Sequence, residues 1–159
     1  MVRAAARRPR IHGLLRSAAR RRAGRHWVAA VGAVIDGDRV LVAEHAFRGG
    51  SVALLGGWVH AHEDPFRALE REVREETGLE VEAVDVVASE RQGSELHPLR
   101  YSALTIGFRC RLRDGEPSEP ANVSPELGEV RWVAVDAVGG LLSGFEAEVV
   151  AQAWGRVSR

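Results

Sequence analysis

The strongest local folding signal in this 159-residue chain is an amphipathic helix expected over residues 65–77. Asp64 is a favourable N-cap, Pro65 suits the first helical position, and Gly78 is a typical helix stop. Three apolar residues recur at the spacing that gives a helix one apolar face: Phe66, Leu69 and Val73. Such a face must pack against another layer, so the helix predicts a layered fold around it.

The segments around this helix alternate between strand and helix patterns. Apolar runs at 28–35 and 40–43, separated by Asp36-Gly37-Asp38, predict a hairpin. We expect further strands at 81–88, 101–112 and 130–135, a loop at 114–125 and a closing helix over 145–157. In the strand at 101–112, one mostly apolar face is expected from Ser102, Leu104, Ile106, Phe108, Cys110 and Leu112. This order predicts an α/β fold with a mixed sheet between helices.

Composition limits the classes of protein that remain. The chain is 45% hydrophobic and 28% charged, which is ordinary for one globular domain. It has a single cysteine, Cys110, so an internal disulfide and a cysteine-cluster metal site are excluded. No apolar run approaches the roughly 20 residues that a membrane-spanning helix needs. We therefore expect a cytoplasmic protein with Cys110 in its core and no membrane span.

Charge divides the chain into two parts, an arginine-rich arm at 1–26 and a domain at 27–159. All 22 basic residues are arginine; nine lie in the arm, which has no acid, and the remainder carries all 22 acids and a net charge of −9. Apolar residues at helical spacing indicate a short helix in the arm: Ile11, Leu14, Leu15 and Ala18. The arm is interpreted as a solvated tail or short packed helix, a patch for nucleic acid or a membrane surface, or a targeting segment.

The polar side of the expected helix over 65–77 carries the chemistry. Glu72, Glu75 and Glu76 stand at i, i+3 and i+4, so their carboxylates share one face and repel one another. Three carboxylates without His or Cys partners favour a hard cation that binds oxygen, Mg²⁺ or Mn²⁺. The alternative is a solvated helix whose glutamates pair with its own arginines: Arg67, Arg71 and Arg74.

Residues 57–79 resemble the Nudix box, G-x5-E-x7-R-E-U-x-E-E-x-G-U, where U is a bulky apolar residue. Every specified position is filled, by Gly57, Glu63, Arg71, Glu72, Val73, Glu75, Glu76, Gly78 and Leu79. Residues 31–45, the Gly56-Gly57 pair and residues 129–133 are similar to the family's flanking elements, so the resemblance covers about residues 27–145. It implies a Nudix-type α/β/α sandwich with a mixed sheet.

The resemblance also implies a function. Nudix hydrolases typically cleave the diphosphate linkage of a nucleoside diphosphate joined to another moiety X, by water attack at phosphorus with Mg²⁺ or Mn²⁺. The implied metal ligands are Glu72, Glu75, Glu76 and the backbone carbonyl of Gly56, and one of the glutamates or a loop glutamate would be the general base. Arg71 and Glu63 would orient the loop and helix. A supplementary glutamate is expected among Glu90, Glu95, Glu119, Glu126 and Glu129, of which we favour Glu126.

The sequence offers several candidate substrate contacts without naming one substrate. Leu55, His60 and His62 depart from residues that are frequent in the family, and a positive φ at position 62 would suit His less well than Gly. Candidates for stacking on a base are Trp58, Phe47 and Tyr101, and candidates for holding a phosphate are Arg48 and Arg91. The alternatives are a non-catalytic ligand-sensing module with a nucleic-acid-binding arm and, more remotely, an isoprenoid diphosphate isomerase. The intact box and the expected core position of the cysteine argue against them.

Overall fold

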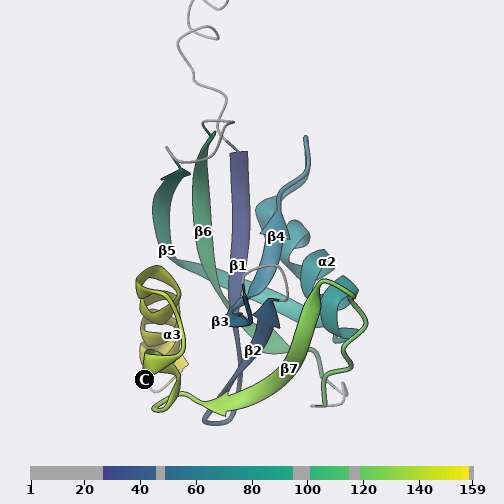
Figure 1. The fold of residues 1–159 in the computed structure, drawn as a ribbon, viewed down its shortest axis with the longest axis vertical. Helices are drawn as coiled ribbons and strands as arrows, with labels where there is room; N and C mark the ends of the chain where they lie inside the picture. Colours follow the sequence, from purple (N-terminus) through teal and green to yellow (C-terminus); the bar gives the residue numbers. More distant parts are fainter. Residues whose placement is uncertain (1–26, 46–48, 95–100, 115–118, 158–159) are drawn as a thin grey trace, which may run out of the picture.

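The computed structural model describes residues 27–45, 49–94, 101–114 and 119–157 (Figure 1). The expectations for the arm, for Phe47 and Arg48, and for the Tyr101 side chain lie outside the described part. The elements are, in chain order, β1 (Trp27–Asp36), β2 (Arg39–His45), β3 (Ser51–Ala53), β4 (Leu55–Trp58), α2 (Pro65–Thr77), β5 (Val81–Ser94), β6 (Tyr101–Leu112), β7 (Leu127–Ala134), the 3-10 turn η2 (Val138–Gly140) and α3 (Gly144–Val157).

The strands form one mixed sheet in the order β3-β2-β1-β6-β5, with β4 added to β1 and β7 added to β2. Among the strands that the structure describes, only β1 and β6 run parallel. The predicted hairpin is present, but β1 and β2 pair only beside the turn, at Ile35–Val40 and Asp36–Arg39. Beyond those pairs β1 joins β4 and β6 while β2 joins β3 and β7. The hairpin therefore opens, and it connects the two halves of the sheet.

Helices α2 and α3 cover opposite faces of this sheet (Figure 1). Alternate residues of each strand point to opposite faces, so neighbours in β2 separate: Leu41 belongs to the core beneath α2, and Val40 and Val42 belong to the core beneath α3. The resulting three layers confirm the expected α/β/α sandwich with a mixed sheet.

Local signals define the ends of α2 as predicted. The Asp64 carboxylate accepts a hydrogen bond from the Phe66 N–H at 2.9 Å. Gly78 adopts a left-handed conformation with φ of 74° and ends the helix, a conformation that glycine adopts without strain. On the inner face Leu69 and Val73 are fully buried. Phe66 packs edge-to-face on Phe108 of β6, with ring centroids 4.8 Å apart.

Two expectations about the strands need correction. The strand expected over 81–88 continues to Ser94, because its polar second half pairs residue by residue with β6. In β6, Phe108 and Cys110 are buried toward α2 as expected, but Leu104 is 40% exposed while Ala103 and Thr105 of the other face are buried. The strand lies between β1 and β5, and it packs on α2 through Phe108 and Cys110 and on α3 through Gly107, so alternation does not separate core from solvent there.

The closing helix and the cysteine behave as predicted. Val149, Val150 and Ala153 of α3 are buried in the core beneath that helix. The Cys110 side chain is also buried, and burial raises the pKa of its thiol. No helix in the described part of the chain is long and apolar enough to cross a membrane.

Candidate active site

The loop before α2 is fixed to the helix by one carboxylate. Arg71 Nε and Nη2 donate to the two oxygens of Glu63 at 2.9 and 3.0 Å, and the His60 N–H donates to Glu63 Oε2 at 2.9 Å. These hydrogen bonds, those from Arg71 foremost, lower the pKa of Glu63 to about 2. The arrangement agrees with the orienting role that the sequence suggested for Glu63 and Arg71.

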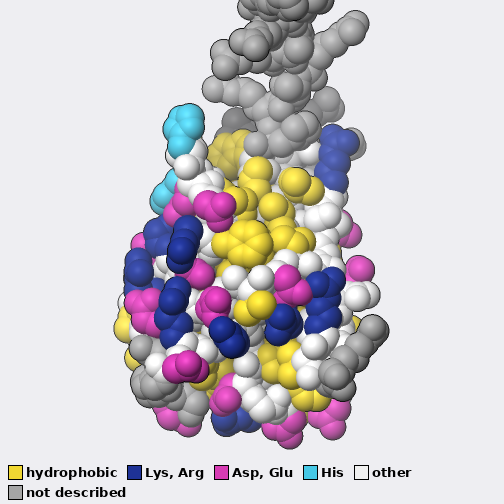
Figure 2. Space-filling view, turned by 180° about the vertical axis from the view of Figure 1, so that it is seen from behind, with side chains coloured by type: hydrophobic (Ala, Val, Ile, Leu, Met, Phe, Trp, Pro, Cys, Tyr) yellow, Lys and Arg dark blue, Asp and Glu magenta, His cyan; other side chains and the backbone are white. Residues whose placement is uncertain are grey.

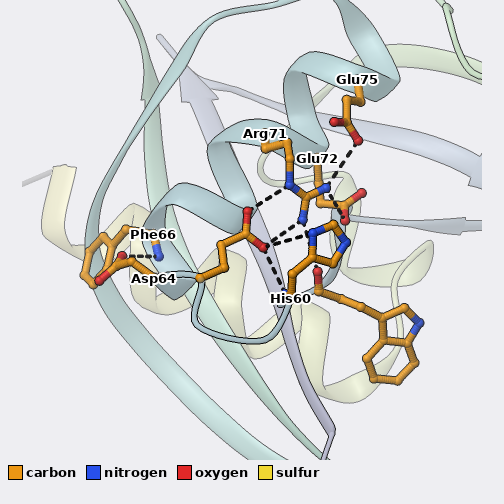
Figure 3. A network of polar contacts seen from close by, with 8 residues as sticks. His60, Asp64, Phe66, Arg71, Glu72 and Glu75 are labelled. Carbon is orange, nitrogen blue, oxygen red and sulfur yellow. Dashed lines mark hydrogen bonds and ion pairs between the residues drawn. The ribbon is translucent and has the colours of Figure 1, made fainter.

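Arg71 also reaches two of the box glutamates. Its Nη1 atom donates to Glu72 Oε1 at 2.9 Å and to Glu75 Oε2 at 3.2 Å, and its Nη2 atom donates to the Trp58 carbonyl at 3.2 Å. Figure 3 shows Glu72 and Glu75 on the same side of the Arg71 guanidinium, each joined to it by a dashed line. Over the rest of α2, acidic and basic side chains interleave on the outer surface (Figure 2). One guanidinium thus joins the loop, β4 and the acidic face of α2.

The two glycines of β4 let the carboxylates approach the sheet. A Cβ atom on Gly57 would lie 2.5 Å from Glu72 Cδ, so any other residue would displace this carboxylate. Gly56 has φ of 147°, and a Cβ atom there would lie 2.1 Å from the Ala30 carbonyl oxygen. Position 56 therefore requires glycine for steric reasons, and glycine at position 57 leaves the Glu72 carboxylate where it lies.

Glu76 lies deepest among the box glutamates. Its Oε2 atom is 3.3 Å from the Gly56 N–H, which donates to it. Burial, together with the charges of Glu72, Glu126 and Glu75, raises the pKa of Glu76 to about 7, against the opposing effect of the Gly56 hydrogen bond. A carboxyl group with this shift lies in an acidic, partly desolvated place, and such shifts are frequent at functional sites.

Glu126 comes to the same place through the loop that follows β6. The Ala121 N–H donates to the Thr77 carbonyl at 3.0 Å, and the Val123 N–H donates to the Glu76 carbonyl at 3.2 Å. The last carbonyls of α2 thereby hold the segment just before Glu126. Of the five supplementary glutamates considered, Glu126 is the one that lines the cavity described next; Glu95 lies outside the described residues.

A cavity of about 610 Å³ opens beside these carboxylates. Glu72, Glu76 and Glu126 line one part of it together with Gly56 and Gly57. Most of the remainder is formed by β1, β3, β6 and the residues around the start of α3, with single residues from β2, β4, β5 and β7. Its volume falls within the range of about 300–1,000 Å³ that is usual for small-molecule sites.

The residues present fit a hard divalent cation. Within the described parts of the chain, no three His, Cys, Asp or Glu side chains are already gathered into a metal-holding cluster, because Glu72 and Glu75 turn to Arg71 while Glu76 turns to Gly56. The available donors are nevertheless carboxylate and carbonyl oxygens, the ligands that Mg²⁺ and Mn²⁺ prefer. The raised pKa of Glu76 results from burial first and from the charges of Glu72, Glu126 and Glu75 second, and a cation would offset those charges.

The other predicted site residues lie in different places. Trp58 lines the cavity and is 43% exposed. Glu75 and Arg91 do not line it; Glu75 is 56% exposed, and Arg91 donates from β5 to the Ser102 hydroxyl at 2.9 Å. The structure therefore brings Glu72, Glu76, Glu126, Gly56 and Trp58 together and leaves Glu75 and Arg91 at the side.

Sequence reasoning missed the contribution of α3 to the cavity. The Glu146 carboxylate accepts from the Ser143 hydroxyl at 2.7 Å and from the Leu54 N–H at 3.3 Å. It thus links the start of α3 to the chain just before Gly56. The spacing Ser143-x-x-Glu146 is a capping-box pattern, so half of this link could have been predicted from the sequence.

The two histidines of the loop before α2 differ in backbone conformation. His62 has φ of 69°, the positive value at a non-glycine position that its departure from the family pattern suggested. The His60 Nδ1 atom lies 3.7 Å from Glu63 Oε2. Both side chains are exposed, and neither lines the cavity.

Comparison with known proteins assigns the family. The model of the NUDIX domain matches residues 25–152, so the chain belongs to this family. The fold agrees: the crystal structure of a MutT NUDIX hydrolase from Burkholderia pseudomallei superposes with a TM-score of 0.64, at 22% identity, over 80% of this chain and 98% of that one.

Two curated relatives show how much of the chain is shared. The NAD-capped RNA hydrolase NudC of Pseudomonas aeruginosa is 34% identical over 108 residues, 66% of this chain and 35% of NudC. A Mycobacterium tuberculosis protein named "Putative 8-oxo-dGTP diphosphatase 2" is 33% identical over 118 residues, 69% of this chain and 82% of that protein. The matched region thus spans about a third of NudC but most of the mycobacterial protein.

Proposed function

We propose that this chain is a Nudix pyrophosphohydrolase that uses Mg²⁺ or Mn²⁺ to cleave the diphosphate linkage of a nucleoside diphosphate derivative. The observation that carries the proposal is the placement of Glu76 beside Glu72 and Glu126 at one end of a cavity of about 610 Å³, with its pKa raised to about 7. The complete box and the relatives named above support a diphosphate substrate.

Glu72, Glu76 and the Gly56 carbonyl would hold the metal, with Glu75 able to join them from the outer side of α2. When bound, the ion would neutralise charge on the diphosphate and activate a water molecule. Arg71 keeps Glu72 oriented from the side facing the loop, and Gly57 leaves room for that carboxylate. A carboxylate oxygen of Glu126 or Glu76 would accept the proton of the attacking water, because both residues line the cavity.

A screen of diphosphate compounds tests the activity. Reduced and oxidised nicotinamide dinucleotides, ADP-ribose, an NAD-capped oligonucleotide and 8-oxo-dGTP would be incubated with Mg²⁺ or Mn²⁺, and nucleotide products separated by chromatography. We expect cleavage within the diphosphate linkage of at least one compound and its loss in EDTA. Full activity in EDTA would contradict the metal requirement, and absence of turnover across the set would favour the ligand-sensing alternative.

The arginine-rich arm at 1–26 is proposed to be dispensable for the chemistry. Every box residue lies beyond position 56, so deletion of residues 1–20 should change kcat/KM by less than about tenfold. A larger loss in a truncated protein with unchanged melting temperature would mean that the arm takes part in the site. Binding of the full chain, but not the truncated chain, to a short RNA would assign the arm to nucleic acid.

We further propose that the protein acts in the cytoplasm on a small nucleotide-type substrate. The single cysteine is unpaired and buried, and disulfides are rare in reducing compartments. Fractionation of the source cells with an antibody to the protein tests the location, and recovery in the membrane or secreted fraction would contradict it.

A further inference from the structure

We infer that Trp58, supported by Trp27, forms with the adjoining sheet surface a site for an uncharged planar ring, the nucleobase of the substrate. The inference rests on the proposed function, because it assigns the half of the cavity that the carboxylates do not use. The inference concerns which part of the substrate is recognised. Cleavage of the diphosphate bond is still assigned to the carboxylate site described above.

Two tryptophans are exposed at one end of β1 and β4. Trp27 is 57% exposed and Trp58 is 43% exposed, whereas Trp132 and Trp154 are more deeply buried. The rings of Trp27 and Trp58 meet edge-to-face, with centroids 5.2 Å apart and an interplanar angle of 72°. Large aromatic surface left open to solvent beside a cavity is typical of a binding site.

The sheet surface next to Trp58 is made of small side chains. Ala29 and Val31 of β1 and Ala103 and Thr105 of the parallel strand β6 line the same cavity as Trp58. Ala29 pairs with Trp58 across β1 and β4, and with Thr105 across β1 and β6. The ladder therefore places a flat, largely apolar surface directly beside the indole, and a planar ring can lie on such a surface without displacing a large side chain.

The charges of the lining residues determine which end of the substrate lies beside Trp58. Among the described lining residues there is no arginine. The acidic ones are Glu72, Glu76 and Glu126 beside the two glycines, and Glu146 at the start of α3, whose carboxylate accepts from the Ser143 hydroxyl and the Leu54 N–H. Phosphate groups would accordingly lie at the carboxylate end, where a metal ion can screen them. An uncharged ring is the part of a nucleotide that suits the surface between Trp58 and Thr105.

Trp27 is assigned a positioning role. It does not line the cavity; its backbone pairs with Ala103 in the ladder, and its ring packs edge-to-face on Trp58. Aromatic pairs of this geometry contribute beyond their buried area and restrict the orientation of both rings. Loss of Trp27 should therefore weaken binding of the ring through Trp58 and leave the chemical step unchanged.

Binding of uncharged nucleosides in EDTA tests the site without metal or hydrolysis. Adenosine, guanosine and ribose would be titrated into the full-length protein and followed by NMR of the ligand. We expect the nucleosides to bind at least about tenfold more tightly than ribose, and Trp58→Ala to remove this preference, since one base–aromatic stack has an effect of that size. Trp58→Phe should retain most of it. Equal binding of ribose and nucleosides, or full binding by a folded Trp58→Ala protein, would overturn the inference.

Kinetics with the best substrate separates positioning from folding. Trp27→Ala should raise KM by about tenfold with kcat within about twofold of the wild type, because a stack present in both ground and transition states changes KM alone; Trp27→Phe should restore KM. Leu104→Ala is the matched control, an exposed apolar residue of β6 that does not line the cavity, and should leave KM unchanged. An unchanged KM in Trp27→Ala would contradict the positioning role.

The two proposals fail separately. Cleavage that is indifferent to Trp58→Ala and equal for substrates with and without a base would contradict the ring site and leave the hydrolase intact. Nucleoside binding that depends on Trp58, in a protein that cleaves none of the diphosphate compounds, would support the ring site and contradict the hydrolase.

Discussion

The helices α2 and α3 cover opposite faces of one sheet with opposite compositions. Seven of the 13 residues of α2 are charged, against three of the 14 residues of α3. Both helices bury one apolar stripe, but only α2 carries neighbouring carboxylates on its outer turns. The difference shows that burial and contacts at its ends stabilise α3, whereas α2 also needs Arg71 to offset the repulsion between its own carboxylates.

The same difference distinguishes the helix that carries the reactive carboxylates, α2, from the helix that supports the cavity, α3. The Glu76 carboxylate of α2 is destabilising to the metal-free protein, because burial and the neighbouring negative charges raise its pKa. The polar end of α3 is instead satisfied internally, because Glu146 accepts from Ser143 and from the backbone of Leu54. The cavity wall formed by α2 thus keeps an unfavourable buried charge, and the wall formed by α3 does not. Unfavourable interactions of this kind are concentrated at functional sites, which marks the α2 wall as the reactive wall.

The largest change is expected from Arg71→Met. Removal of the guanidinium leaves Glu63 and Glu72, both less than a fifth exposed, without their main partner, and breaking such pairs costs about 3 kcal/mol of unfolding free energy. Turnover should fall by about 100-fold because Glu72 loses its orientation. Urea denaturation and steady-state kinetics measure both.

The matched control is Arg74→Met, one turn away. Arg74 is 52% exposed and lies 3.8 Å from Glu80, so its loss should change stability by less than about 0.5 kcal/mol. Equal effects of the two substitutions on stability and turnover would contradict the claim that α2 depends on Arg71 in particular.

Glu76 should give the metal-free protein a pH-dependent stability. Its pKa rises from 4.5 to about 7 on folding, so between these values the folded state binds more protons and stability falls as pH rises. The loss is complete above about pH 7 and amounts to about 3 kcal/mol at most. Glu76→Gln should remove this part of the slope and be the more stable protein at pH 8 in EDTA. A constant difference between the two proteins from pH 5 to pH 8 in denaturation experiments would contradict this.

The caps of the two helices should contribute equally to stability. Asp64 accepts from the first turn of α2, and Ser143, just before α3, donates its N–H and its hydroxyl to the Glu146 carboxylate. Replacing either with alanine should reduce the unfolding free energy by about 1 kcal/mol. Because α2 forms the reactive wall, Asp64→Ala should also lower turnover more than Ser143→Ala does. The reverse order would contradict the assignment of the reactive wall to α2.

The smallest effect is expected at the loop before α2. His62 has φ of 69°, a conformation in which a Cβ atom is strained and glycine is not. His62→Gly should raise the unfolding free energy by about 0.5 kcal/mol, the strain relief being partly offset by a more flexible unfolded chain. His60→Gly relieves no backbone strain and should therefore lower the unfolding free energy. A melting-temperature shift of the same sign for both variants would argue against strain at His62.

Local elements could be predicted from the sequence because their determinants lie within a few residues. The bounds of α2 follow from Asp64 and Gly78, and the glutamate pattern predicted the acidic face. The outer half of β5 could not be predicted, since its polar residues resemble a loop until β6 pairs with them. The β-ladder alone brings Trp27 to Trp58, and the bond from Leu54 to Glu146 joins residues 92 positions apart. Contacts of this kind depend on topology, which periodicity does not encode.

The most direct test of the account compares Glu76→Gln with Glu63→Gln in Mg²⁺ titrations and in turnover. Both substitutions remove one carboxylate charge, one beside the Gly56 N–H and the other beside Arg71. We predict that Glu76→Gln lowers turnover by about 100-fold or more and weakens Mg²⁺ binding, whereas Glu63→Gln changes Mg²⁺ affinity by less than about threefold and chiefly loosens the loop. Near-normal turnover in Glu76→Gln, with turnover abolished in Glu63→Gln, would contradict the assignment of the metal site.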